Sequence, residues 1–132
     1  AVDEDSAAFE AVMDAFRLPK EEEGRKNAIQ AATVGAADVP LNVARLALDA
    51  MQLAEQVAQH GNKNAATDAA TAALMALAAV EGAALNVRVN AVGLDDADLA
   101  ERYQNDIGAL VDRARELRDK VVAAAEKRAG LS

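Results

Sequence analysis

The sequence predicts an all-helical (all-α) fold, a bundle of long antiparallel helices around a central alanine-rich helix. Alanine, the strongest helix former, fills about a quarter of the 132 positions. Only two prolines interrupt the chain, and the aromatic and β-branched runs that favour strands are scarce. A chain of this length suits one hydrophobic core, so we expect residues 1–132 to form a single domain.

Prolines and glycines mark the limits of the first helices. Apolar residues at helical spacing predict a helix from about residue 3 to residue 17 that ends before Pro19, because proline disfavours helix at the preceding residue. Pro19 is suited to the first turn of the next helix. Pro40 either kinks that helix or divides it in two, and the apolar spacing then continues to His60, followed by the helix-ending Gly61.

The segment from residue 65 to about residue 90 is predicted to be the central helix. It carries no charge between Asp68 and Glu81 and is apolar or small all round, which is typical of a helix contacted on every side. We expect Asn64 or Thr67 to cap its beginning, and Asn86 to Asn90 to be largely buried. The uncharged stretch is too short to span a bilayer, so a buried helix is predicted.

A last helix is expected to follow a loop at residues 91–94. Asp95 or Asp96 can cap its first turn, and Gly130 can close it after Ala129. Its apolar residues lie along one stripe, with charged residues on the other face. This segment therefore completes the bundle.

Charge and composition exclude several classes of function. The net charge of −8 repels nucleic-acid backbones and anionic membranes, so neither is expected as a partner. The absence of cysteine removes disulfides, thiolate catalysis and Cys-based zinc sites. His60 is the only histidine, and scattered carboxylates form no ligand cluster, so no metal is predicted. No signal-like segment opens the sequence, which makes the cytoplasm the expected location.

Polar residues on the predicted central helix are candidates for a binding site. Asp68 and Asn86 are separated by about five full turns, so they project from the same side, and Asn90 lies one turn further on. Such groups can line a cleft. Alternatively, Asp68 caps the first turn and the asparagines bond to neighbouring backbone inside the core. The pattern leaves both readings open.

Three carboxylates, Asp3, Glu4 and Asp5, lie at the head of the first helix. Carboxylates at this position usually cap the helix and interact with its dipole. Phe9 follows one turn after Asp5, and a carboxylate beside apolar neighbours can instead act as a general acid. Composition alone does not choose between these roles.

Several short motifs occur in a definite order along most of the chain. They are Val2-Asp3-Glu4-Asp5 followed by Phe9, Leu18-Pro19-Lys20, Arg25, Val39-Pro40-Leu41, Gly61-Asn62, Thr67-Asp68, and Gly82-Ala83 followed by Asn86-Val87-Arg88-Val89-Asn90. Together they resemble the cyclodeaminase/cyclohydrolase family of folate enzymes, which includes formiminotransferase-cyclodeaminase and methenyltetrahydrofolate cyclohydrolase.

The resemblance implies an all-helical domain that dimerises and holds folate in a cleft near the dimer interface. The family's reaction closes 5-formiminotetrahydrofolate to 5,10-methenyltetrahydrofolate with release of ammonia, or is the related cyclohydrolase reaction, and it requires no cofactor besides the folate substrate. The resemblance makes Asp5 the proton donor, and Asp68, Asn86 and Asn90 the lining of the pterin and formimino-carbon region.

Asn62 and Lys20 are the remaining substrate-binding residues that the resemblance implies. Lys20 is suited to the glutamate carboxylates of a folate, although a solvated charge is the commoner fate of such a residue.

Family members usually carry an upstream alanine-rich helical segment beside the cleft. This sequence lacks it, so we expect the domain to be truncated at its N-terminus, with the missing helices either absent or supplied as a separate piece. The alternative function is a non-catalytic helical module for oligomerisation or partner binding, in which Asp68, Asn86 and Asn90 only satisfy buried backbone groups.

Overall fold

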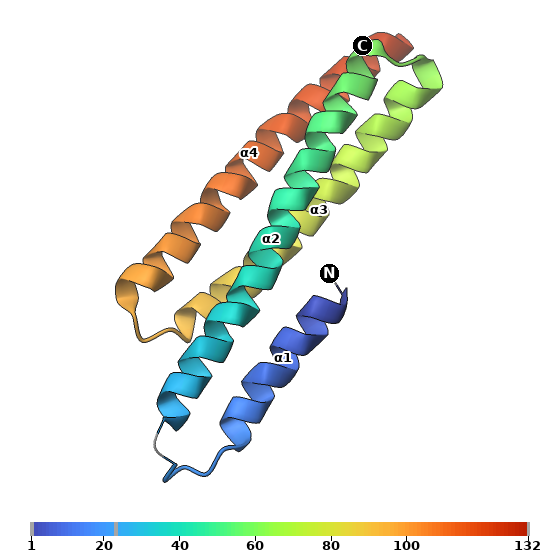
Figure 1. The fold of residues 1–132 in the computed structure, drawn as a ribbon. Helices are drawn as coiled ribbons and strands as arrows, with labels where there is room; N and C mark the ends of the chain where they lie inside the picture. Colours follow the sequence, from blue (N-terminus) through green and yellow to red (C-terminus); the bar gives the residue numbers. More distant parts are fainter. Residues whose placement is uncertain (1, 23, 132) are drawn as a thin grey trace.

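The computed structural model describes residues 2–22 and 24–131, which form four α-helices joined by short loops (Figure 1). The helices are α1 (Val2–Arg17), α2 (Arg25–His60), α3 (Lys63–Val92) and α4 (Ala97–Ala129). Consecutive helices run antiparallel, and no strand occurs in the described residues. The predicted all-helical bundle of long antiparallel helices is confirmed.

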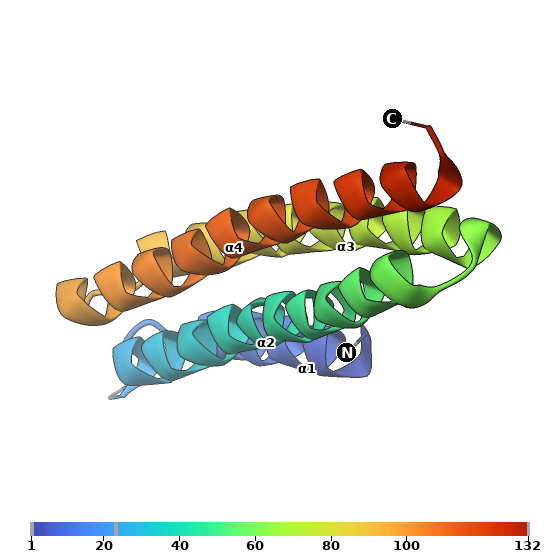
Figure 2. The same ribbon diagram turned by 90° about the horizontal axis from the view of Figure 1, so that it is seen from above.

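The helix that contacts all the others is α2. Figures 1 and 2 show α2, α3 and α4 side by side, with the shorter α1 beside the first half of α2. Across residues 2–22 and 24–131, α1 packs against α2 and against neither α3 nor α4. Within this chain, α2 rather than the alanine-rich α3 is therefore the central helix.

Small side chains allow α2, α3 and α4 to pack closely. Alanine supplies much of the buried core, and the larger fully buried side chains are few. These larger side chains are Met51, Val80, Val87, Ile107, Leu117 and Val121. Because alanine adds little bulk beyond the helix backbone, it lets neighbouring helices approach closely while still removing apolar surface from water.

The structure corrects the expectation about Pro19 and excludes one of the two alternatives for Pro40. Pro19 lies in the loop between α1 and α2 rather than in the first turn of α2, which begins at Arg25. The residue before Arg25 is Gly24, whose φ of 90° is left-handed, a conformation that glycine adopts without steric cost. Pro40 does not divide the second helix, since α2 continues through it.

Arg25 connects the end of α1 to the start of α2. Its Nε donates to the Leu18 carbonyl at 3.0 Å, and its Nη2 donates to the Phe16 carbonyl at 3.1 Å. The guanidinium carbon also lies 5.8 Å from the centre of the Phe16 ring. Arg25 thus satisfies carbonyl groups that the end of a helix leaves without partners.

Side-chain caps define the starts of α3 and α4. The prediction of Asn64 or Thr67 as the cap of α3 is wrong, because Asn62 holds that position and its Oδ1 accepts from the Ala65 N–H at 2.9 Å. The prediction for α4 is confirmed at Asp96, whose carboxylate accepts from the Leu99 N–H at 3.1 Å.

The prediction that α3 is contacted on every side is wrong. Met75, Leu85 and Val89 are between 67% and 69% exposed, and Asn86 is exposed as well. These residues remain uncovered because α2 and α4 are the helices that pack against α3 among the described residues.

By length and composition alone, α3 is also long and apolar enough to cross a membrane. Its most apolar window of 18 residues has a mean hydropathy of 1.6, and 33% of that window is buried. A helix in the core of a folded bundle meets the same criterion, so this property does not by itself indicate a membrane span.

A hydrogen bond between Tyr103 and Asp38 links α4 to α2. The Tyr103 hydroxyl donates to the Asp38 carboxylate, and the Tyr103 side chain is buried. Burial, together with this hydrogen bond, raises the pKa of Tyr103 to about 12 from its usual value of 10.

This pKa shift predicts a loss of stability at high pH. The free energy of unfolding gains the full contribution of Tyr103 below about pH 10. It should then fall by about 1.4 kcal/mol per pH unit between about pH 10 and 12, because the unfolded chain loses the phenol proton first. Urea unfolding at pH 8, 10 and 11 should show the advantage of the wild type over Tyr103→Phe shrinking with pH. A constant difference would contradict the assignment.

Packing through alanine makes a second prediction. Ala73 is fully buried, so Ala73→Leu should lower the free energy of unfolding by about 1–3 kcal/mol through overpacking. Its neighbour Ala72 is exposed, and Ala72→Leu should change stability by less than about 0.5 kcal/mol. Denaturant unfolding of both variants tests this, and equal losses would mean that the two helix faces do not differ in packing.

Candidate functional site

A groove of about 590 Å³ runs between α1 and the C-terminal half of α3, with α2 beneath it. It exists because α1 packs on α2 without contacting α3. Its lining comprises Asp5, Ser6, Ala8, Phe9, Glu10 and Val12 of α1, Ala36 of α2, and Asn86, Val89 and Asn90 of α3.

A more apolar hollow of about 410 Å³ continues from this groove toward the start of α1. Asp5, Ser6 and Asn86 line both the groove and this hollow, so the two spaces adjoin. The hollow is lined in addition by Val2, Val39, Pro40, Val43, Ala79, Gly82 and Ala83. Small residues on α3 leave this part of the surface open and apolar.

The polar groups of the groove come from opposite walls. Asp5, in the first turns of α1, is exposed and lines both hollows. Asn86 and Asn90 lie one turn apart on the wall formed by α3. The groove therefore places a carboxylate on one side and two carboxamides on the other.

The two asparagines differ in how they are held. Asn90 Nδ2 donates to the Asn86 carbonyl at 2.8 Å and, across the helix interface, to the Ala36 carbonyl at 3.3 Å. For the Asn86 side chain, no hydrogen bond to another residue is found in the part of the chain that the structure describes. Asn90 thus has a structural bond of the kind that the alternative reading expected, whereas the Asn86 amide is free to meet a ligand.

Apolar side chains flank these polar groups. Phe9 on α1 is 62% exposed, Val89 on α3 is 68% exposed, and both line the groove. A space bounded by apolar surface and a few convergent polar groups is typical of a small-molecule site. The amides can recognise the donors and acceptors of a heterocyclic edge, and the carboxylate can transfer a proton or bind a cation.

The structure does not bring Asp68 into this groove. Asp68 is exposed near the start of α3, and eighteen residues of helix place it about 27 Å from Asn86 along the axis. The two residues share a side of the helix, as predicted, but they do not share a site within one chain. The substrate-binding role of Asp68 stays a prediction.

Asn62 and Lys20 also lie outside the groove. Asn62 caps α3 at the end of the bundle opposite Asn90, and Lys20 is exposed in the loop between α1 and α2. Their predicted roles in substrate binding likewise stay predictions.

Ser6 and Glu10 were missed by the sequence reasoning, although both line the groove. Their spacing in the sequence could have indicated them, because Ser6 and Glu10 are four residues apart and so lie along one side of α1, next to Asp5. Recognising it required knowing which side of α1 faces α3, and an isolated amphipathic helix does not reveal that.

Among residues 2–22 and 24–131, no group of three or more His, Asp or Glu side chains is placed to hold a metal ion. The expectation that no metal is used remains a prediction.

The fold and the groove define an all-helical protein with a cleft suited to a small polar ligand. The chain belongs to the formiminotransferase-cyclodeaminase family, whose family model matches residues 1–109. The sequence-based assignment to this family is confirmed.

Two curated relatives and one solved structure show the extent of the similarity. Methenyltetrahydrofolate cyclohydrolase of Methylorubrum extorquens is 43% identical over 122 residues, which cover 89% of this chain and 59% of that protein. Formimidoyltransferase-cyclodeaminase of Gallus gallus is 33% identical over 131 residues, which cover 96% of this chain and 24% of that protein.

The crystal structure of formiminotetrahydrofolate cyclodeaminase from Thermotoga maritima superimposes with a TM-score of 0.84 at 27% identity. The match covers 94% of this chain and 60% of that structure. The chain thus spans at most about three fifths of the length of these relatives.

Proposed function

We propose that this chain carries the folate-converting site of its family and acts on the one-carbon unit joined to N5 and N10 of tetrahydrofolate. The observation that carries the proposal is the meeting of Asp5 with Asn86 and Asn90 at one groove. The groove volume of about 590 Å³ lies within the usual range of small-molecule sites. The names of the relatives supply the substrate class.

The methenyltetrahydrofolate cyclohydrolase reaction is the first candidate, because the relative with 43% identity bears that name. In this reaction, water attacks the methenyl carbon between N5 and N10 and a tetrahedral intermediate forms. The hydroxyl of the intermediate then loses its proton and becomes the formyl C=O as the bond from that carbon to N5 breaks. N5 gains a proton, and 10-formyltetrahydrofolate and one released proton result. Asp5 would accept a proton from the water and return one to N5.

The cyclodeaminase reaction is the second candidate, favoured by the names of the Gallus gallus and Thermotoga maritima relatives. Here N10 attacks the formimino carbon, and the carbon–nitrogen bond to the departing group breaks. Asp5 would protonate that nitrogen so that it leaves as ammonia. Both reactions pass through a tetrahedral carbon, so one acid serves either.

The asparagines suit the charge of these substrates. The methenyl group is a cationic amidinium, and carboxamides offer donors and acceptors without adding charge. The Asn86 amide is exposed on the groove wall, while Asn90 is held against α2 by its bond to Ala36. In this proposal they bind the pterin edge and orient it toward Asp5. The chemistry needs proton transfer and orientation of the substrate, so we propose that no metal or nucleotide cofactor takes part. We also propose that the protein acts in the cytoplasm.

We also propose that the protein works as a homodimer. The exposed side of α3 carries apolar or small residues at helical spacing that do not line the groove: Met75, Ala78, Leu85 and Val92. A stripe of this spacing is the geometry by which helices pair. Helices present in the longer relatives, in the same chain or as a separate piece, are proposed as further partners beside the groove.

The proton-transfer role predicts the behaviour of Asp5→Asn. This variant should lower kcat about 100-fold or more for the conversion of methenyltetrahydrofolate or formiminotetrahydrofolate, because the amide cannot exchange the proton. Binding of 5-formyltetrahydrofolate, a stable analogue, should change little. Asp3→Asn is the matched control, since Asp3 is exposed on the same helix and does not line the groove. Full activity in Asp5→Asn would refute the assignment of Asp5.

The dimer proposal predicts a concentration-dependent mass in sedimentation. Met75→Glu should raise the dimer dissociation constant at least about tenfold, because it places a charge in an apolar interface. Asn105→Glu on α4, at an exposed polar position, should leave the dissociation constant unchanged. A wild-type monomer at all concentrations, or a Met75→Glu dimer as tight as the wild type, would exclude this interface.

A further inference from the structure

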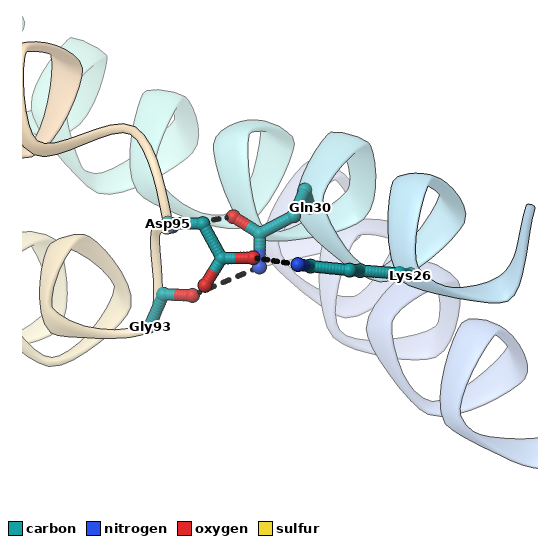
Figure 3. A network of polar contacts seen from close by, with 4 residues as sticks. All are labelled: Lys26, Gln30, Gly93 and Asp95. Carbon is teal, nitrogen blue, oxygen red and sulfur yellow. Dashed lines mark hydrogen bonds and ion pairs between the residues drawn. The ribbon is translucent and has the colours of Figure 1, made fainter.

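The Gln30 side chain on α2 forms hydrogen bonds with two residues of the loop between α3 and α4, Gly93 and Asp95 (Figure 3). Its Nε2 donates to the Gly93 carbonyl at 3.1 Å, and its Oε1 accepts from the Asp95 N–H at 2.8 Å. Lys26 lies on α2 one turn before Gln30, and its ammonium is 3.5 Å from the Asp95 carboxylate. A single carboxamide therefore spans the loop and fixes it to α2.

Hydrogen bonds continue from this loop to the groove. The Gly93 N–H donates to the Asn90 carbonyl at 3.0 Å, and the Asn90 side chain donates to the Ala36 carbonyl on α2. The same side chain also donates to the Asn86 carbonyl. Gln30 is thus connected through Gly93 to both asparagines of the α3 wall.

Close packing fills the space between these two attachments. Thr33 lies on α2 midway between Gln30 and Ala36, and its side chain is buried. A Cβ placed on Gly93 would lie 3.6 Å from Thr33 Cγ2 and 3.4 Å from the Asn90 carbonyl oxygen. The end of α3 and the loop after it therefore contact α2 at three positions spaced by three residues, Gln30, Thr33 and Ala36.

This attachment matters because α1 does not contact α3 among the described residues. Because α1 packs only on α2 among these residues, the position of the α3 wall relative to Asp5 depends on how α3 packs on α2. Asn90 lies in the final turn of α3, and helix ends open more readily than helix centres. The contacts that stop this turn from opening determine the width of the groove at the asparagines.

We infer that Gln30 is a positioning residue, which holds the last turn of α3 so that Asn86 and Asn90 face Asp5 at the separation needed to bind folate. Gln30 does not line the groove and so does not itself touch the ligand. The inference rests on the proposed function of the groove. Gln30 lies outside the groove and sets the positions of the asparagines that line it.

Gln30→Met is the main test, because methionine keeps the length of the side chain and removes both hydrogen bonds. We expect the KM for the folate substrate and the Kd for 5-formyltetrahydrofolate to rise about tenfold, with kcat changed less than about threefold. Hydrogen exchange at the amides of residues 90–95 should become at least about tenfold faster.

Arg128→Met is the matched control. Arg128 Nε donates to the Gly61 carbonyl at 2.7 Å, so it attaches the loop between α2 and α3 to α4, at the opposite end of the bundle. This variant also loses a loop contact, but its folate KM and Kd should equal those of the wild type. Gln30→Glu should be intermediate, because its carboxylate can still accept from Asp95 N–H but cannot donate to Gly93.

Three results would overturn the inference: an unchanged KM in Gln30→Met, unchanged exchange at residues 90–95, or an equal loss of affinity in Arg128→Met. These outcomes are distinct from failure of the proposed function. If the wild-type protein neither binds nor converts folates, the function fails and the positioning role for it falls too. If the wild type binds folate and Gln30→Met binds it equally well, the positioning role alone is refuted.

Discussion

The attachment of α1 to α2 alone is the constraint on which the candidate site depends. A fourth helix packed against both α2 and α3 would fill the space between them with side chains, as happens between α2, α3 and α4. Because α1 leaves α3 uncovered, Asp5 and the two asparagines face each other across open space. The close alanine packing of the other three helices provides the rigid surface that this arrangement requires.

Helix positions were largely predictable from the sequence, because apolar spacing and terminal residues act locally. Asp96 and Gly130 were recognised as the ends of α4 from their residue types alone. Pro19 was misplaced because α2 begins only at Arg25, six residues later, directly after the left-handed Gly24. The burial of α3 was overestimated, since an apolar helix composition does not reveal which of its sides has a neighbour.

The site was predictable in part. Helical spacing pointed to Asn86 and Asn90, the resemblance to the family selected Asp5 among three carboxylates, and the fold brings all three to one groove. Asp68 was grouped with them because helical periodicity fixes direction, yet it does not limit distance along the axis. Gln30 carried no motif, and its importance follows only from contacts to residues more than sixty positions away.

The position of Asp5 on α1 has a mechanical consequence. The C-terminal end of α1 is fixed by the buried Ala15 and by the Arg25 guanidinium, whereas Asp5 lies about 15 Å away toward the other end. Over that length, a tilt of α1 by about 5° displaces the carboxylate by about 1.3 Å, which exceeds the tolerance of a proton-transfer geometry. The bonds that Arg25 makes at the end of α1 therefore affect the alignment of the acid as directly as any group beside it.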